Sequence, residues 1–236
     1  MVSEKKSHHK ILVTGTTSDY IQWIRSSCPG RALFITHPDI RQRAVEDPPG
    51  KDEEILIALS DKGRALDALL THLKKWGQSL EGVFSFDCES MALASFIARE
   101  LNLDYPSLEA VRNARDKYIS KQLWRDHHIG CPRISPVNSV SDAIEFFNRT
   151  ETGCVLKPFT GSGSELVFLC QTESGCGSAF ETIKTGLDLR NENPLFKQTS
   201  SHPHLMLAEE YMEGPEYSCD FTVENGTVRV IRLAKK

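Results

Sequence analysis

The alternation of short apolar runs with helix-like segments in the first half of the chain most constrains its fold. Four runs resemble strands: Lys10–Thr14, Leu33–Thr36, Glu54–Leu59 and Gly82–Phe86. The third run is apolar without alternation, which is typical of strands buried on both faces of a parallel sheet. Between the third and fourth runs, residues 61–76 place leucines on one helical face, with Asp61 as N-cap and Gly77 as the stop. This alternation predicts a doubly wound α/β domain of residues 1–106.

Ligands of doubly wound sheets bind at the carboxyl ends of the strands. This rule puts Thr14–Ser18 and Ser85–Glu89 at a ligand edge. The segment after the first strand lacks the G-x-G-x-x-G spacing, so a nicotinamide dinucleotide is not indicated. An ordinary strand-to-helix turn, capped by Ser18 or Asp19, is the alternative to ligand contact at this edge.

The pattern changes after Pro106. Residues 107–128 predict one or two charged helices, and Ser141 is a plausible cap for another helix. Residues 180–185 are helical in pattern, whereas residues 191–204 are polar and poor in pattern.

Hairpins are the second feature of this half of the chain. Strand-like residues 154–157 and 165–169 flank a glycine- and serine-rich loop. Asn225-Gly226 is a strong hairpin turn signal between residues 217–223 and 227–233. Helices mixed with hairpins predict a second domain of α+β character.

Composition excludes several classes of protein. The 236 residues carry 28 Lys and Arg against 32 Asp and Glu, a net charge of −4, which argues against a nucleic-acid partner. No apolar stretch is long enough to span a membrane, and the polar N-terminus has no secretory signal. The seven cysteines are scattered without a C-x-x-C pair. They predict reduced thiols in a cytoplasmic protein, with no structural metal site.

The stretch Val155–Ser164 is the most informative for chemistry. Lys157 ends one strand, and Gly161, Ser162, Gly163 and Ser164 follow before the next. Glycines let backbone N–H groups approach phosphate oxygens, hydroxyls add donors, and an ammonium group neutralises charge. The order is not that of a Walker A loop, because the lysine precedes the glycines. A flexible hairpin loop beside a surface lysine is the alternative.

Two further stretches can contribute to a nucleotide site. Lys117 lies near the start of a charged helix, and an acidic linker runs from Glu209 to Glu216. An extended linker can offer backbone N–H and C=O groups to an adenine edge, while a fixed carboxylate holds ribose hydroxyls. Taken singly, a solvated helix face and an acidic turn are the alternatives.

In order, character and separation, these three stretches resemble the ATP-grasp superfamily, in the manner of carboxylate-amine ligases and carbamoyl-phosphate synthase large chains. The resemblance implies a pre-ATP-grasp domain at residues 1–106, a flap subdomain at 107–207, and the linker with the start of a last subdomain at 208–236. It implies that Lys117 and Lys157 are nucleotide lysines and that Gly161–Ser164 form a flap over the triphosphate. The backbone of Glu210, Tyr211 and Met212 would meet adenine near the Glu209 carboxylate, and Glu216 would hold the ribose hydroxyls.

The resemblance also implies a reaction. ATP phosphorylates a substrate carboxylate, and an amine then displaces phosphate from the acyl phosphate. The cofactors would be ATP and Mg²⁺, with Mg²⁺ ligands expected beyond Lys236, where this sequence stops. Small carboxylic acids and amines would be the partners, and an unpaired sheet edge favours a homo-oligomer. Two alternatives stay open: a nucleotide-binding regulatory module without catalysis, and an interaction domain that binds no nucleotide.

Overall fold

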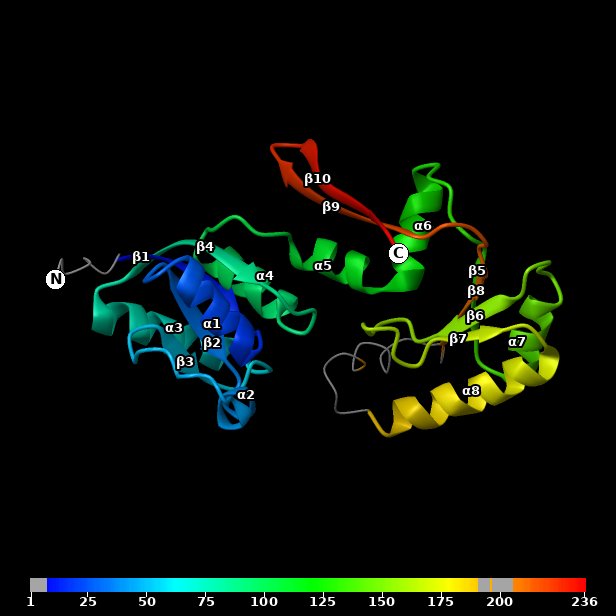
Figure 1. Ribbon diagram of the computed structural model, residues 1–236, viewed down its shortest axis with the longest axis horizontal. Coiled ribbons are helices and arrows are strands. Elements are labelled where there is room, and N and C mark those ends of the chain that lie inside the picture. Colours follow the sequence, from blue (N-terminus) through cyan, green and yellow to red (C-terminus); the bar gives the residue numbers. More distant parts are fainter. Residues whose placement is uncertain (1–7, 191–195, 197–205) are drawn as a thin grey trace. The chain divides into compact units, whose positions relative to one another are not determined.

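The computed structural model describes residues 8–190, Phe196 and residues 206–236 (Figure 1). The chain forms two compact units. Residues 8–123, with 160–163 and Phe196, belong to the first, and residues 124–159, 164–190 and 206–236 belong to the second. Within these residues, no helix combines the length and the apolar character that crossing a membrane requires. The predicted segment 191–204 lies outside the described residues, apart from Phe196.

A parallel sheet organises the first unit. Its strands run in the order β3-β2-β1-β4, with bounds β1 (His9–Thr14), β2 (Ala32–Thr36), β3 (Glu54–Leu56) and β4 (Ser79–Ser85). Every pairing between neighbours is parallel. All residues of β2 are buried, as expected for a strand covered on both faces. The predicted parallel α/β fold is confirmed, although β3 ends at Leu56 and not at Leu59.

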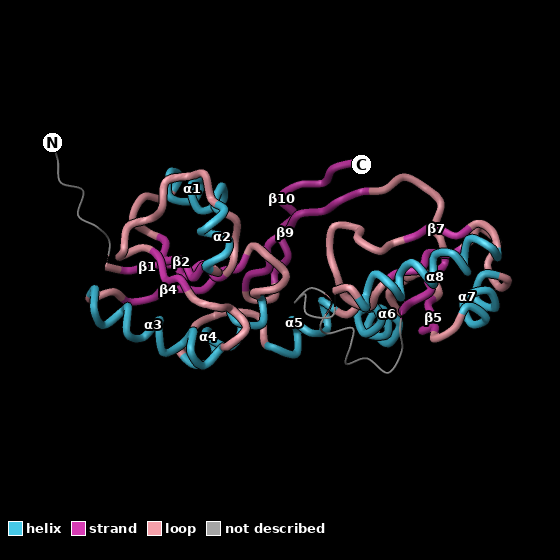
Figure 2. The backbone as a smooth tube through the Cα atoms, turned by 90° about the horizontal axis from the view of Figure 1, so that it is seen from below, coloured by secondary structure: helices cyan, strands magenta, loops and turns pink. Residues whose placement is uncertain are grey.

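Helices cover both faces of this sheet. They are α1 (Ser18–Ser27), α2 (Pro38–Arg43), α3 (Lys62–Trp76) and α4 (Met91–Glu100). Leu12 and Leu33 face a core shared with α3 and α4, whereas Val13 and Phe34 face Ile21 of α1. Figure 2 shows α3 and α4 on one side of the sheet and α1 on the other.

The helix signals within the first unit are confirmed with one omission and one correction. Thr17, not Ser18 or Asp19, is the N-cap position of α1, because the helix already begins at Ser18. The Asp61 side chain accepts a hydrogen bond from the Arg64 N–H at 3.0 Å, and Gly77 ends α3 with φ of 60°. Residues 107–128 form two helices, α5 (Leu108–Arg115) and α6 (Lys117–Asp126). The short α2 was not predicted from its sequence.

An antiparallel sheet organises the second unit. Its strands run in the order β5-β8-β6-β7, with bounds β5 (Ile134–Val137), β6 (Cys154–Lys157), β7 (Phe168–Cys170) and β8 (Met206–Glu210). Helices α7 (Val140–Phe147) and α8 (Glu173–Asp188) share one core with the buried side chains of these strands. Strands β9 (Tyr217–Glu224) and β10 (Thr227–Lys235) form a separate hairpin. Its turn places Asn225 and Gly226 at positive φ, as the sequence predicted.

The structure corrects three local predictions in the second unit. Ser139, not Ser141, caps α7, and it forms a capping box with Asp142 because each side chain accepts a backbone N–H of the other. Strand β7 is limited to residues 168–170, since Ser164 and Leu166 adopt left-handed turn conformations. Helix α8 extends well beyond residues 180–185, because the Thr172 side chain caps its start.

Candidate functional site

Strand β6 presents different chemistry on its two faces. Cys154 and Leu156 are completely buried in the core with α7 and α8, whereas Val155 and Lys157 are partly exposed. The alternation follows from strand geometry, because successive side chains point to opposite faces. On the neighbouring strand β8, Ala208 pairs with Leu156 and Glu209 pairs with Val155. One face of the β6–β8 pair is therefore apolar, and the other carries Lys157 and Glu209.

Lys157 and Glu209 form an ion pair across these strands. Lys157 Nζ lies 2.8 Å from Glu209 Oε2, and the two side chains are 14% and 13% exposed. In the antiparallel register, Lys157 stands diagonally across from Glu209, within reach of a long side chain. The ammonium group is therefore held at the end of β6 by a carboxylate in a mostly desolvated position.

The loop that follows β6 runs from Pro158 to Ser164. Phe159 and Thr160 are buried, whereas Ser162, Gly163 and Ser164 are exposed. Gly161 and Gly163 have φ of 123° and 66°, in the region that favours glycine. A Cβ on Gly161 would lie only 3.0 Å from Phe196 Cε1, so the glycine also permits close packing. The exposed part of the loop leaves its backbone open to an incoming group.

The linker after β8 is fixed at its start by backbone hydrogen bonds. The Glu210 N–H donates to the Arg133 carbonyl, and the Tyr211 N–H donates to the Gly153 carbonyl at 3.1 Å. The Thr152 hydroxyl donates to the Tyr211 carbonyl at 2.6 Å. Among the described residues, no partner is found for the backbone of Met212. Met212 is therefore among the linker positions whose backbone N–H and C=O are open to a ligand edge.

The two linker carboxylates have different surroundings. Arg133 donates two side-chain hydrogen bonds to Glu210, at 3.0 and 2.9 Å, and these bonds lower the pKa of the Glu210 carboxyl. Glu216 is exposed, and its Oε1 lies 2.5 Å from Lys236 Nζ. Arg133 and Thr152 were missed from the sequence, because each contacts the linker only through the folded sheet.

Lys117 begins α6 in the chain segment that belongs to the first unit. Asp116 caps this helix, since its Oδ1 accepts the N–H groups of Tyr118 and Ile119 at 2.9 and 3.0 Å. Lys117 is partly buried. Its predicted role in a site with Lys157 stays a prediction.

A separate cavity lies at the ligand edge of the parallel sheet. It has a volume of about 320 Å³ and is lined by Thr16 and Thr17 after β1 and by Phe86, Asp87 and Glu89 after β4. Strands β1 and β4 are neighbours at the point where the strand order reverses, which is where open α/β sheets bind ligands. Tyr20 and Phe86 form part of its rim, with ring centroids 5.6 Å apart.

Gly15 is necessary for the shape of this edge. Its φ is 60°, and a Cβ there would lie 1.9 Å from Ser90 Oγ and 2.4 Å from Asp87 Oδ2. The chain can therefore pass from β1 to α1 close to the β4–α4 loop only with glycine at this position. A larger hollow of about 430 Å³ lies beside α3 at the opposite end of β3, so it is not at the ligand edge.

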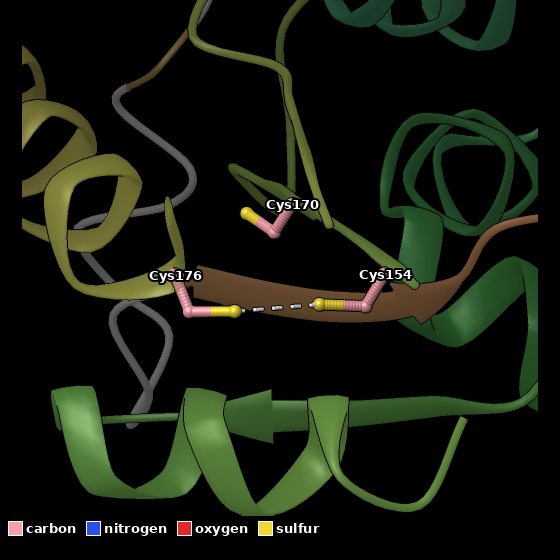
Figure 3. Close-up of side chains that lie close together, drawn as sticks. All are labelled: Cys154, Cys170 and Cys176. Atoms are coloured by element: carbon pink, nitrogen blue, oxygen red, sulfur yellow. Dashed lines mark hydrogen bonds between the residues drawn. The ribbon is translucent and has the colours of Figure 1, made fainter. Parts of the chain in front are cut away.

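Three cysteines converge on the apolar side of β6. Cys154, Cys170 and Cys176 come from β6, β7 and α8, and their sulfur atoms all lie within 4.8 Å of one another (Figure 3). Hydrogen bonding among the thiols raises the pKa of Cys154 and lowers the pKa of Cys170 to about 7, while burial raises the pKa of Cys176 to about 11. Among the described residues, this is the only group of three or more metal-binding side chains with converging ligand atoms. Its sulfur ligands do not fit Mg²⁺, which prefers oxygen.

Comparisons with known proteins agree with this geometry. Residues 150–236 match the family model of the ATP-grasp domain. Human carnosine synthase 1 is 27% identical over 166 residues, which cover 64% of this chain and 19% of that protein. The L-amino acid ligase of Bacillus licheniformis has a similar structure, with a TM-score of 0.67 and 15% identity over 98% of this chain and 51% of the ligase.

A third relative was solved with a nucleotide. It is the biotin carboxylase domain of the Hydrogenobacter thermophilus 2-oxoglutarate carboxylase, in complex with MgADP and bicarbonate. Its TM-score is 0.64 at 15% identity, over 96% of this chain and 50% of that domain. The chain therefore shares its fold with the L-amino acid ligase and with this biotin carboxylase domain. Residues 150–236 thus match the ATP-grasp domain family, and the chain spans about half the length of these structures.

Proposed function

We propose that this protein binds ATP at the Lys157 face of β6 and acts as an ATP-dependent carboxylate-amine ligase. The observation that carries the proposal is the ion pair of Lys157 and Glu209, at the point where β6 runs into the Gly161–Ser164 loop. A lysine fixed at 14% exposure retains little hydration to lose when it meets a phosphate. The family match to residues 150–236 supports the same assignment.

Each site residue then has a physical task. Lys157 neutralises the α- and β-phosphates, and the exposed backbone of Gly163 and its neighbours donates to phosphate oxygens. The Met212 backbone meets the adenine edge, since the Tyr211 backbone is occupied within the fold. Glu216 holds the ribose hydroxyls once it leaves Lys236, which costs little because the pair is exposed. Lys117 is the second nucleotide lysine.

The reaction would proceed in two transfers. A substrate carboxylate oxygen attacks the γ-phosphorus and ADP leaves, which forms an acyl phosphate. An amine nitrogen then attacks the acyl carbon, phosphate leaves with the bonding electron pair, and the amine proton passes to solvent or a base. Lysine charge stabilises the phosphoryl group during the first transfer, and a closed loop keeps water from the acyl phosphate. Among the described residues, no three carboxylate or histidine ligands converge on one point, and no step is assigned to Mg²⁺.

The cavity at the ends of β1 and β4 is the proposed acceptor site. Asp87 and Glu89 give its wall negative charge, which suits a protonated amine, and Tyr20 and Phe86 offer an apolar surface. Its volume of about 320 Å³ is at the lower end for small-molecule pockets. An amino acid fits both the charge and the size. The Bacillus licheniformis relative is itself an L-amino acid ligase, which supports an acceptor of this class.

The test is a calorimetric titration of ATP into the full chain, followed by an assay of phosphate release with amino-acid pairs. We expect one ATP per chain with a Kd in the micromolar to millimolar range. Failure of ATP to bind at millimolar concentration would overturn the nucleotide site. ATP binding without phosphate release under any acid and amine pair would instead favour a nucleotide-binding module. Replacing ATP with 2′-deoxy-ATP tests Glu216, because a lost hydrogen bond to a charged group weakens binding by about 10-fold or more.

Two predictions about the setting of the protein accompany this proposal. A reducing, cytoplasmic compartment accords with seven cysteines that form no disulfide in the structure. Pairing with another chain accords with the β9–β10 hairpin, which exposes Phe221, Val230 and Leu233. Size-exclusion chromatography with light scattering measures the second of these.

A further inference from the structure

The cluster of Cys154, Cys170 and Cys176 lies outside every residue assigned to the nucleotide. Cys154 and Cys176 are 0% exposed and Cys170 is 1% exposed, so all three side chains lie within the core. Cys154 and Cys170 are directly opposite each other in the β6–β7 register, and Cys176 lies in the first turns of α8. Three elements thus bring three sulfur atoms to one point. Packing alone requires only small apolar side chains there.

The spacing of the sulfur atoms suits a single soft cation. A metal–thiolate bond of about 2.3 Å puts the sulfur atoms of a trigonal three-sulfur site about 4.0 Å apart. Cys154 Sγ and Cys176 Sγ are 4.0 Å apart, and all three sulfur atoms lie within 4.8 Å of one another (Figure 3). Small rotations of the side chains would therefore complete a trigonal site without backbone movement.

The ligand set distinguishes among thiophilic metals. We propose that Cys154, Cys170 and Cys176 bind one monovalent copper ion. Thiolates select Cu⁺, Zn²⁺ and iron–sulfur clusters. Structural zinc sites take four ligands, and the described residues add no histidine, carboxylate or fourth cysteine to this group.

The position of the site gives copper a structural effect. Binding ties β6 and β7 to the start of α8, and each thiol that bonds to copper releases its proton to solvent. Lys157 lies three residues beyond Cys154 on β6, on the opposite face of the strand. The copper and nucleotide sites share no residue. A copper titration and an ATP titration therefore test the two proposals independently.

The first experiment removes the other thiols. In a Cys28→Ser/Cys88→Ser/Cys131→Ser/Cys219→Ser variant, only the cluster can supply thiolate ligands. Cu⁺ is added under anaerobic conditions in competition with a chromophoric Cu⁺ chelator. We expect one Cu⁺ per chain to be withheld from the chelator, and thermal unfolding to move to higher temperature. Removal of all copper by the chelator would overturn the proposal, as would retention of Zn²⁺ in preference to Cu⁺.

The second experiment locates the ion. Cys170→Ala in the same background should weaken Cu⁺ binding by about 100-fold or more, since it removes a direct ligand. Leu169→Ala is the matched control, because this neighbour is 48% exposed and its loss should leave Cu⁺ affinity unchanged. X-ray absorption of the four-serine variant tests the same site without a core substitution. Three sulfur neighbours at about 2.3 Å are expected. Two sulfur neighbours, or nitrogen and oxygen ligands, would contradict the site.

Discussion

The two faces of β6 differ in what they can exchange with solvent. On one face, Leu156 and Cys154 are sealed beneath α7 and α8, and on the other, Lys157 pairs with Glu209 at the edge of the core. The strand is only four residues long, and its successive side chains point to opposite faces. The difference shows how one short strand can bury apolar side chains on one face and hold a charged side chain on the other. Stability and ligand affinity should therefore respond to different substitutions.

The largest effect on stability should come from the sealed face. Leu156→Ala is expected to lower the free energy of unfolding by about 2–5 kcal/mol, because it leaves a cavity in a closed core. Val155→Ala is the matched substitution on the other face and should cost distinctly less, because this side chain is only partly buried. Urea unfolding measures both. Equal losses of unfolding free energy in the two variants would contradict the proposed difference between the two faces.

On the charged face, a double-mutant cycle should show an energetic coupling between Lys157 and Glu209. Lys157→Met and Glu209→Gln, alone and together, are expected to give an interaction energy of about 0.5–3 kcal/mol in unfolding free energy. The reason is that either single substitution leaves a mostly buried charge without its counterion. Arg232 and Asp220 form an exposed pair in β9–β10, and their cycle is the control. A coupling no larger than that control would show that the Lys157 pair is an ordinary surface contact.

A substitution at the start of α7, which covers the buried face of β6, should have a smaller effect on stability. Ser139→Ala should destabilise the protein by about 1 kcal/mol, because it removes the hydrogen bond to the Asp142 N–H. Ser141→Ala lies two residues further along and should change stability by less than about 0.5 kcal/mol. Thermal unfolding of the two variants decides between the observed cap and the one that the sequence suggested.

The smallest effect should appear only in acid. Arg133 holds the pKa of Glu210 below its ordinary value of 4.5, so the folded state favours the ionised carboxyl. The stability from this shift is therefore complete above about pH 4.5 and is lost as the pH falls through the folded-state pKa. The free energy of unfolding of the Arg133→Gln variant should therefore approach that of wild type as the pH falls through this range. In a Glu210→Gln background, the effect of Arg133→Gln should be the same at every pH.

Much of this architecture follows from local signals. The apolar runs of β1 and β2, the Asp61 cap and the Asn225-Gly226 turn each act over a few residues, so the sequence predicts them. The bounds of β6 were predicted as well, because the strand is apolar and stops at Pro158. Strand β5 was missed, since it has four residues and contains Pro136.

Other features depend on the folded sheet. The convergence of Cys154 with Cys170 is set by the β6–β7 register, which depends on turn conformations at Ser164 and Leu166. These non-glycine residues adopt positive φ, for which their sequence gives no signal. The Lys157–Glu209 pair likewise joins residues 52 positions apart through the β6–β8 register. Motif order identified both residues, but their contact required the structure.

ATP affinity of the Lys157→Ala variant tests the central claim most directly. In a calorimetric titration, Lys157→Ala should weaken ATP binding by about 10- to 150-fold, the equivalent of one hydrogen bond to a charged group. Lys184→Ala, an exposed lysine on α8, should bind ATP as wild type does. Wild-type ATP affinity in the Lys157→Ala variant, with its fold intact by circular dichroism, would contradict the assignment of this face of β6 to the nucleotide.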